Sequence, residues 1–163
     1  MSINYTPRTW VAGEVVSAAE MNTEVRDALT GVQAAWTAYT PTWTATTTNP
    51  TLNNGTLVGK WQRLGKTYLY RINLTMGSTT AFGTGSYLFA LPAAVHADYT
   101  AGNHMGNGVL LDVGVNWNQA AAAWNSSTQI FVLATSNLQV SNTVPFTWGS
   151  GDKLSLAGEP EAA

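Results

Sequence analysis

Residues 57–76 read LVGKWQRLGKTYLYRINLTM and decide the fold of this chain. Two runs with alternating apolar and polar residues flank Gly65-Lys66, and a two-residue loop with glycine in first place is typical of a β-hairpin. In the register that this loop sets, Trp61 faces Tyr70, so the large apolar side chains fall on one side of the hairpin. The segment therefore predicts two long antiparallel strands with one buried face.

The rest of the chain beyond residue 38 also favours strands. Seven Trp, six Tyr and fifteen Gly, with only 10% charged residues, suit pleated faces and tight turns. We expect an antiparallel β-sandwich or jelly-roll-like domain over residues 39–163, preceded by an extended arm and one short helix. Short apolar or alternating runs predict further strands at Thr42 to Thr47, Tyr87 to Leu91, Val109 to Trp117 with one strongly apolar face, Thr128 to Ala134, and Lys153 to Leu156.

Residues 1–38 are expected to serve attachment and oligomerisation. The first 16 residues show no sustained period and indicate an extended arm, whose attachment residues we take to be Tyr5, Pro7, Arg8 and Trp10. Ser17 and Glu20 have the spacing of a capping box, which starts a helix, and Pro41 favours an end between Gly31 and Ala38. A helix of this length is marginal in water without a partner.

The helix carries a short heptad-like seam of small and apolar residues. Two partners for this seam stay open, which are the chain's own β domain and further copies of the chain. The expected oligomer interface comprises Met21, Val25, Ala28, Leu29 and Val32.

Several classes of function are disfavoured by composition. A formal net charge of −2 provides no basic field for nucleic acid, and no apolar stretch is long enough to insert into a membrane. There is no cysteine, and the N-terminus does not follow the pattern of a signal peptide, so we expect no disulfide, no thiolate metal site and no encoded secretion. No cofactor motif is found, and none is expected.

Catalysis also finds little support. Hydrolysis of a glycosidic bond usually needs two carboxylates, and Asp98 and Asp112 are the pair that would have to converge. His96, Asp98 and His104 have a spacing that could bind a metal, although loop histidines bonded to backbone or water are the favoured interpretation. We therefore expect a protein that is not an enzyme and holds no metal.

The hairpin register places Lys60 opposite Arg71, away from the apolar side, and like charges in this arrangement destabilise a sheet. We expect this pair to meet Asp112, a carboxylate of another subunit or an anionic ligand, or else to extend into water. Trp117 and Trp124 complete the candidate contacts, with Trp124 in an alanine-rich loop over Gln119 to Ser127. Long loops, such as those expected from Pro92 to Gly108 and from Asn118 to Ser127, often carry binding surfaces.

The segment TPRTWVAGEVVSAAEMN, residues 6–22, resembles the N-terminal part of small tail and fibre proteins of tailed phages that infect actinobacteria. Residues 92–127 match least, as would suit a variable binding region. Later segments are similar to the β domains of the same proteins, namely Tyr39 to Trp43, Asn53 to Leu57, Trp61 to Lys66, Met76 to Thr80 and Gly151 to Glu159.

This resemblance implies a virion component, commonly a homotrimer, that attaches to other virion proteins through its N-terminal segment and displays the β domain outward. A tail fibre or minor tail protein that binds host-surface glycan is the expected function. A head decoration protein or head fibre is the first alternative, followed by a monomeric carbohydrate-binding module.

Overall fold

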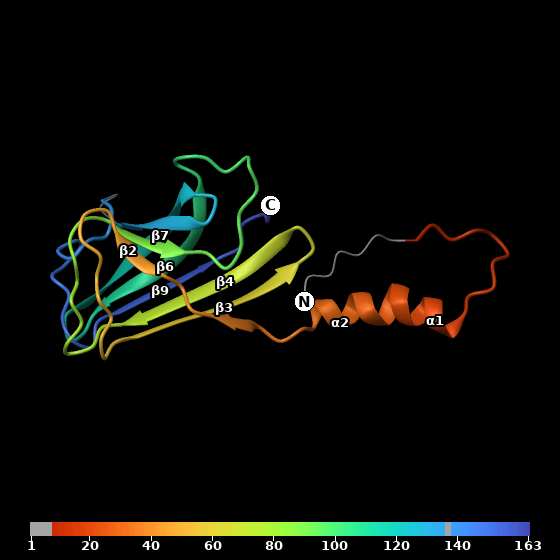
Figure 1. The fold of residues 1–163 in the computed structure, drawn as a ribbon, viewed down its shortest axis with the longest axis horizontal. Helices are drawn as coiled ribbons and strands as arrows, with labels where there is room; N and C mark the ends of the chain where they lie inside the picture. The colour runs from red at the N-terminus through yellow and green to blue at the C-terminus, as the bar shows by residue number, and fades with distance from the viewer. Residues whose placement is uncertain (1–7, 136–137) are drawn as a thin grey trace.

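A computed structural model describes residues 8–135 and 138–163 of the chain, and this part is mainly β (Figure 1). Its strands form one antiparallel sheet in the order β1-β3-β4-β9-β6-β7-β8-β5-β2. Their bounds are Thr37–Tyr39 for β1, Trp43–Ala45 for β2, Thr56–Leu64 for β3, Thr67–Thr75 for β4, Tyr87–Ala90 for β5, His104–Asp112 for β6, Asn116–Ser126 for β7, Gln129–Ala134 for β8 and Lys153–Gly158 for β9.

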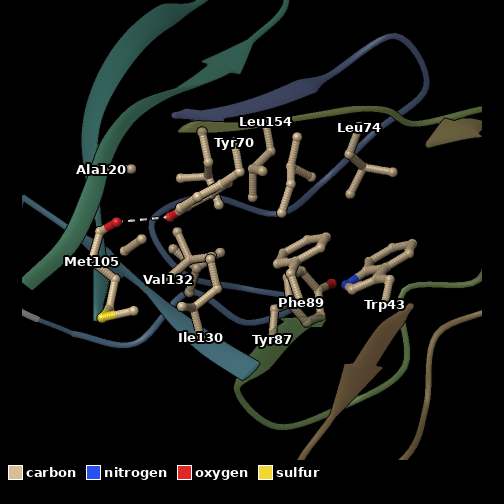
Figure 2. Close-up of a cluster of buried hydrophobic side chains, with 14 of the residues drawn as sticks. Trp43, Tyr70, Leu74, Tyr87, Phe89, Met105, Ala120, Ile130, Val132 and Leu154 are labelled. Atoms are coloured by element: carbon tan, nitrogen blue, oxygen red, sulfur yellow. Dashed lines mark hydrogen bonds between the residues drawn. The ribbon is translucent and has the colours of Figure 1, made fainter. Parts of the chain in front are cut away.

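The sheet curls so that its two halves face each other across a hydrophobic core. Tyr70 and Leu74 of β4 lie opposite Phe89 of β5 and Ile130 of β8, and each of these side chains is at most 1% exposed (Figure 2). The Tyr70 hydroxyl donates a hydrogen bond of 3.1 Å to the carbonyl oxygen of Met105. This mainly β, sandwich-like arrangement confirms the predicted fold class.

The hairpin of β3 and β4 has the predicted register. Leu64 pairs with Thr67 and Trp61 pairs with Tyr70. Gly65 has a φ of 60°, which glycine adopts without steric cost and which the tight turn requires. The predicted strands that begin near Thr42, Tyr87, Thr128 and Lys153 are also present, with bounds that differ by at most two residues.

The predicted strand from Val109 to Trp117 is wrong, because the chain reverses direction within it. Gly114 has a φ of 82°, and the amide of Val115 donates to the carbonyl oxygen of Asp112 at 3.0 Å, which makes the turn between β6 and β7. The predicted apolar face is wrong too. Leu110 is fully buried whereas Val109 is 37% exposed, so the inward positions are the even-numbered ones.

The N-terminal helix consists of α1, Ala18–Met21, a π-helical turn η1, Asn22–Asp27, and α2, Ala28–Val32. Ser17 and Glu20 form the predicted capping box, and the end at Val32 lies in the predicted interval. The π-helical turn was not predicted. Within the described residues, no helix is long and apolar enough to cross a membrane.

The helix projects from one end of the β domain and does not lie along it (Figure 1). A hydrogen bond of 3.0 Å from the side-chain Nε2 of Gln62 to the carbonyl oxygen of Val32 ties the end of α2 to β3. The next residues form β1, which pairs with β3 through Thr37 and Trp61. The predicted boundary between residues 38 and 39 therefore falls inside a strand.

Candidate functional site

The helix presents an apolar face that its own β domain leaves uncovered. Met21, Val25, Leu29 and Val32 are 47%, 43%, 57% and 64% exposed. A π-helical turn holds more residues than an α-helical turn, so steps of four through Met21, Val25 and Leu29 stay close to one line along the helix. The side chain of Ala28, the other predicted interface residue, lies outside the described ones.

The arm folds back onto the first turns of this helix. The Arg8 guanidinium forms ion pairs with Glu14 and Glu20, and it lies 5.1 Å from the centre of the Trp10 ring. The hydrogen bond from Arg8, followed by those from Ser17, lowers the pKa of Glu20 from 4.5 to about 2. Two of the predicted attachment residues, Tyr5 and Pro7, lie outside the described residues.

A hollow of about 370 Å³ opens on the outer face of the sheet, between Trp36 after the helix, the middle of β4, the start of β6 and the end of β9. We call it the Arg71 pocket. Its size is in the range of pockets that bind small molecules. The polar and aromatic residues that line it are Trp36, Tyr70, Arg71, Tyr99, His104, Asn107 and Glu159.

Lys60 and Arg71 are paired across β3 and β4 as predicted. Ala38 is the neighbour of Lys60 on β1. Arg71 is stacked on Trp36, with 4.6 Å between its guanidinium carbon and the ring centre. Within residues 8–135 and 138–163, no carboxylate lies within ion-pair distance of either cation.

Asp112, one of the expected partners of this pair, lies elsewhere. It ends β6 beside the start of β9, where the Val113 amide donates to Asp152 at 2.9 Å. Arg71 pairs instead with Ala157, near the other end of β9.

The two candidate tryptophans differ in environment. Trp117 is 68% exposed on β7 and is free to contact a partner. Trp124 does not lie in a loop, because the predicted loop over Gln119 to Ser127 is mostly strand β7. Its ring packs against the core, and its buried Nε1 has no hydrogen-bond partner among the described residues. Trp124 is therefore a poor ligand contact.

The acidic pair required for hydrolysis does not converge. Asp98 lies in a loop held to the Glu161 end of the sheet, where the His96 amide donates to the Glu161 carbonyl at 3.0 Å. Asp112 lies at the Asp152 end. Nine residues of extended chain separate these ends, roughly 30 Å, whereas glycosidase carboxylates work within about 10 Å.

The two histidines pair separately. His96 Nδ1 lies 3.4 Å from Asp98 Oδ2, and His104 Nε2 lies 3.0 Å from Asn107 Oδ1. Across the described residues, no group of three or more potential metal ligands gathers.

The Arg71 pocket is the site that the sequence analysis missed, although its register already placed Arg71 outward. No local pattern in the sequence brings Trp36, Arg71 and Tyr99 together, so the sequence offered no signal for the pocket. Comparison with protein-family models, with curated proteins and with solved structures finds no match to this chain.

Proposed function

We propose that the chain is a phage virion surface protein that self-associates through its N-terminal helix as a homotrimer and displays its β domain to the host surface. The observation that carries this proposal is the uncovered apolar face of the helix. The helix stands away from the β domain, and each described member of the face is at least 43% exposed. An amphipathic helix of this kind is stable only when its apolar face is buried.

The energetics favour burial against other copies of the chain. Full burial of a Val, Leu or Met side chain contributes about 1.5–3 kcal/mol, and these four are roughly half exposed. Covering the face therefore adds about 4 kcal/mol for each chain. Residues at or near a and d heptad positions pack against their equivalents in a bundle, so the occupant with matching spacing is a second and third copy of the same helix.

The location in a virion is supported by the resemblance of residues 6–22 to the N-terminal segment of phage tail and fibre proteins. Attachment at this end and display at the other fit a helix that projects from one end of the β domain (Figure 1). A scaffold of paired strands with exposed loops also suits a binding role better than a catalytic one, since Asp98 and Asp112 lie at opposite ends of the sheet.

Immunogold labelling of purified particles tests this function. Antibody raised against the whole chain should decorate the outside of particles of the virus that encodes it. Label on the tail would agree with the tail-fibre function, and label on the head would instead assign it as a decoration protein or head fibre. Particles without the chain, by labelling and by mass spectrometry, would contradict the proposal.

A further inference from the structure

The guanidinium of Arg71 contacts an aromatic ring but has no acceptor among the described residues. Its guanidinium carbon lies over the Trp36 ring, 4.6 Å from the ring centre, which restrains the side chain. Within residues 8–135 and 138–163, its N–H groups have no hydrogen-bond acceptor and no carboxylate partner. A planar, oriented guanidinium with free donors matches the geometry of a carboxylate.

The floor of the Arg71 pocket is a row across three strands. Arg71 of β4 pairs with Ala157 of β9, and Ala157 pairs in turn with Asn107 of β6. Adjacent strands lie about 4.8 Å apart, so Arg71 and Asn107 stand roughly 10 Å apart with only a methyl group between them. Side chains that start this far apart leave room for a six-membered sugar ring between them.

The walls of the pocket are fixed by bonds that leave donors available. The Tyr99 hydroxyl accepts a hydrogen bond of 3.2 Å from the Glu161 amide, which holds the ring in place. The side-chain oxygen of Asn107 pairs with His104, so the Asn107 amide nitrogen remains free to donate to a ligand.

Aromatic and polar groups thus surround the floor together. Trp36 and Tyr99 offer ring faces and edges, and Glu159 at the exposed rim offers an acceptor for hydroxyl groups. Ligand sites of this composition bind molecules with one apolar face and several hydroxyl groups.

We propose that the Arg71 pocket binds a carboxylated saccharide, with its carboxylate on Arg71, its hydroxyl groups on Asn107 and Glu159, and its ring against Trp36 or Tyr99. This inference rests on the proposed function and deepens it, because it names the ligand class of the displayed domain. A peptide C-terminus fits less well. The backbone N–H groups of the strands that form the floor already donate within the sheet, so they cannot donate to a terminal carboxylate.

Ligand-observed saturation-transfer NMR on the full chain tests this inference with three probes. D-Glucuronic acid, which has ring and carboxylate, should bind. D-Glucose, which lacks the carboxylate, and acetate, which lacks the ring, should each bind at least about tenfold more weakly, as expected when one charge-assisted hydrogen bond or the ring contact is lost.

Substitutions separate the pocket from general surface charge. Arg71→Ala should lower glucuronate binding by about tenfold or more, and Arg71→Lys should recover only part of it because the planar fork is lost. Lys153→Ala removes another exposed cation, on β9, that does not line the pocket, and it should leave binding unchanged. Circular dichroism of each variant checks that the sheet is intact.

Other outcomes would overturn the inference. Equal binding of glucose and glucuronate, undiminished binding by Arg71→Ala, or acetate as tight as glucuronate would each contradict a carboxylated-saccharide site. Solution mass distinguishes this failure from that of the proposed function. A trimer that does not bind glucuronate would contradict only the proposed saccharide site. A monomer that binds glucuronate would contradict only the proposed self-association through the helix.

Discussion

Replacing Gly59 by alanine should loosen β1 from the edge of the sheet. Tyr39 of β1 pairs with Gly59, and a Cβ atom at residue 59 would lie 2.4, 2.7 and 2.8 Å from three atoms of the Tyr39 ring. The ring is half-buried, and burial raises the pKa of its hydroxyl above the usual value of 10. Displacing it removes about 2 kcal/mol of burial, while alanine in a strand regains about 0.5–1 kcal/mol over glycine. The free energy of unfolding should therefore fall by about 1–1.5 kcal/mol.

In a Tyr39→Ala background, the expected change in the free energy of unfolding caused by Gly59→Ala has the opposite sign. Without the ring, Gly59→Ala should stabilise the chain by about 0.5 kcal/mol, so the two substitutions should couple by about 2 kcal/mol. Urea unfolding, followed by tryptophan fluorescence, measures the free energy of unfolding of the wild type, both single variants and the double variant. All four are compared at one protein concentration, because oligomers unfold with a concentration-dependent midpoint. Destabilisation by Gly59→Ala of similar size in both backgrounds would refute the reasoning.

Three further predictions concern the turn, the surface and the helix. Asp152→Ala should lower the free energy of unfolding, measured in urea, by about 3 kcal/mol, because the Gly149 and Val113 amides, 2.6 and 2.9 Å from the carboxylate, lose their acceptor. A change below about 1 kcal/mol would mean that this carboxylate does not hold the turn. Trp117→Ala should change stability by less than about 0.5 kcal/mol, since the side chain is 68% exposed; a large loss would mean that this ring is covered. Because the pKa of Glu20 is lowered, its contribution to helix stability is complete above pH 4.5 and is lost as the pH falls toward 2. Far-UV circular dichroism should show this loss of helix. Glu20→Gln should abolish the pH dependence.

The parts of the fold that the sequence predicted correctly are set by neighbouring residues. The hairpin depends on Gly65-Lys66 and on alternation within residues 57–76, and both act over a few residues. The start of the helix depends on Ser17 and Glu20, whose mutual bonds close within one turn. Local chemistry of this kind can be recognised without knowing what packs against it.

The wrong predictions concern segments in which tertiary packing decides the course of the chain and the buried side of the strand. The run from Val109 to Trp117 alternates well, yet Leu110 alone of its first three residues is fully buried, because its side lies against the rest of the core. Alanines in β7 have weak strand propensity, but Ala120 and Ala122 are buried where large side chains from other strands fill the space. Tertiary packing, and not the alternation of apolar and polar residues, therefore sets which side chains of this segment are buried.

The candidate site was only half predictable. The pairing of Lys60 with Arg71 follows from the hairpin register, and the structure has that register. The stacking of Trp36 on Arg71 depends on how the segment after α2 returns to the sheet, which no local pattern encodes. The sequence therefore identified the outward Arg71 but not the pocket that it lines.

The mass of the intact chain in solution, measured by sedimentation equilibrium, decides whether the N-terminal helix assembles three copies of the chain. We expect a species of three times the 17.3 kDa chain mass for the wild-type chain, and a monomer with an unchanged β domain when Val25 and Leu29 are both replaced by aspartate. Both residues are exposed in the isolated chain, so the substitutions should not disturb its fold. A wild-type chain that stays monomeric at every concentration, or a trimer that survives both substitutions, would contradict assembly through the helix.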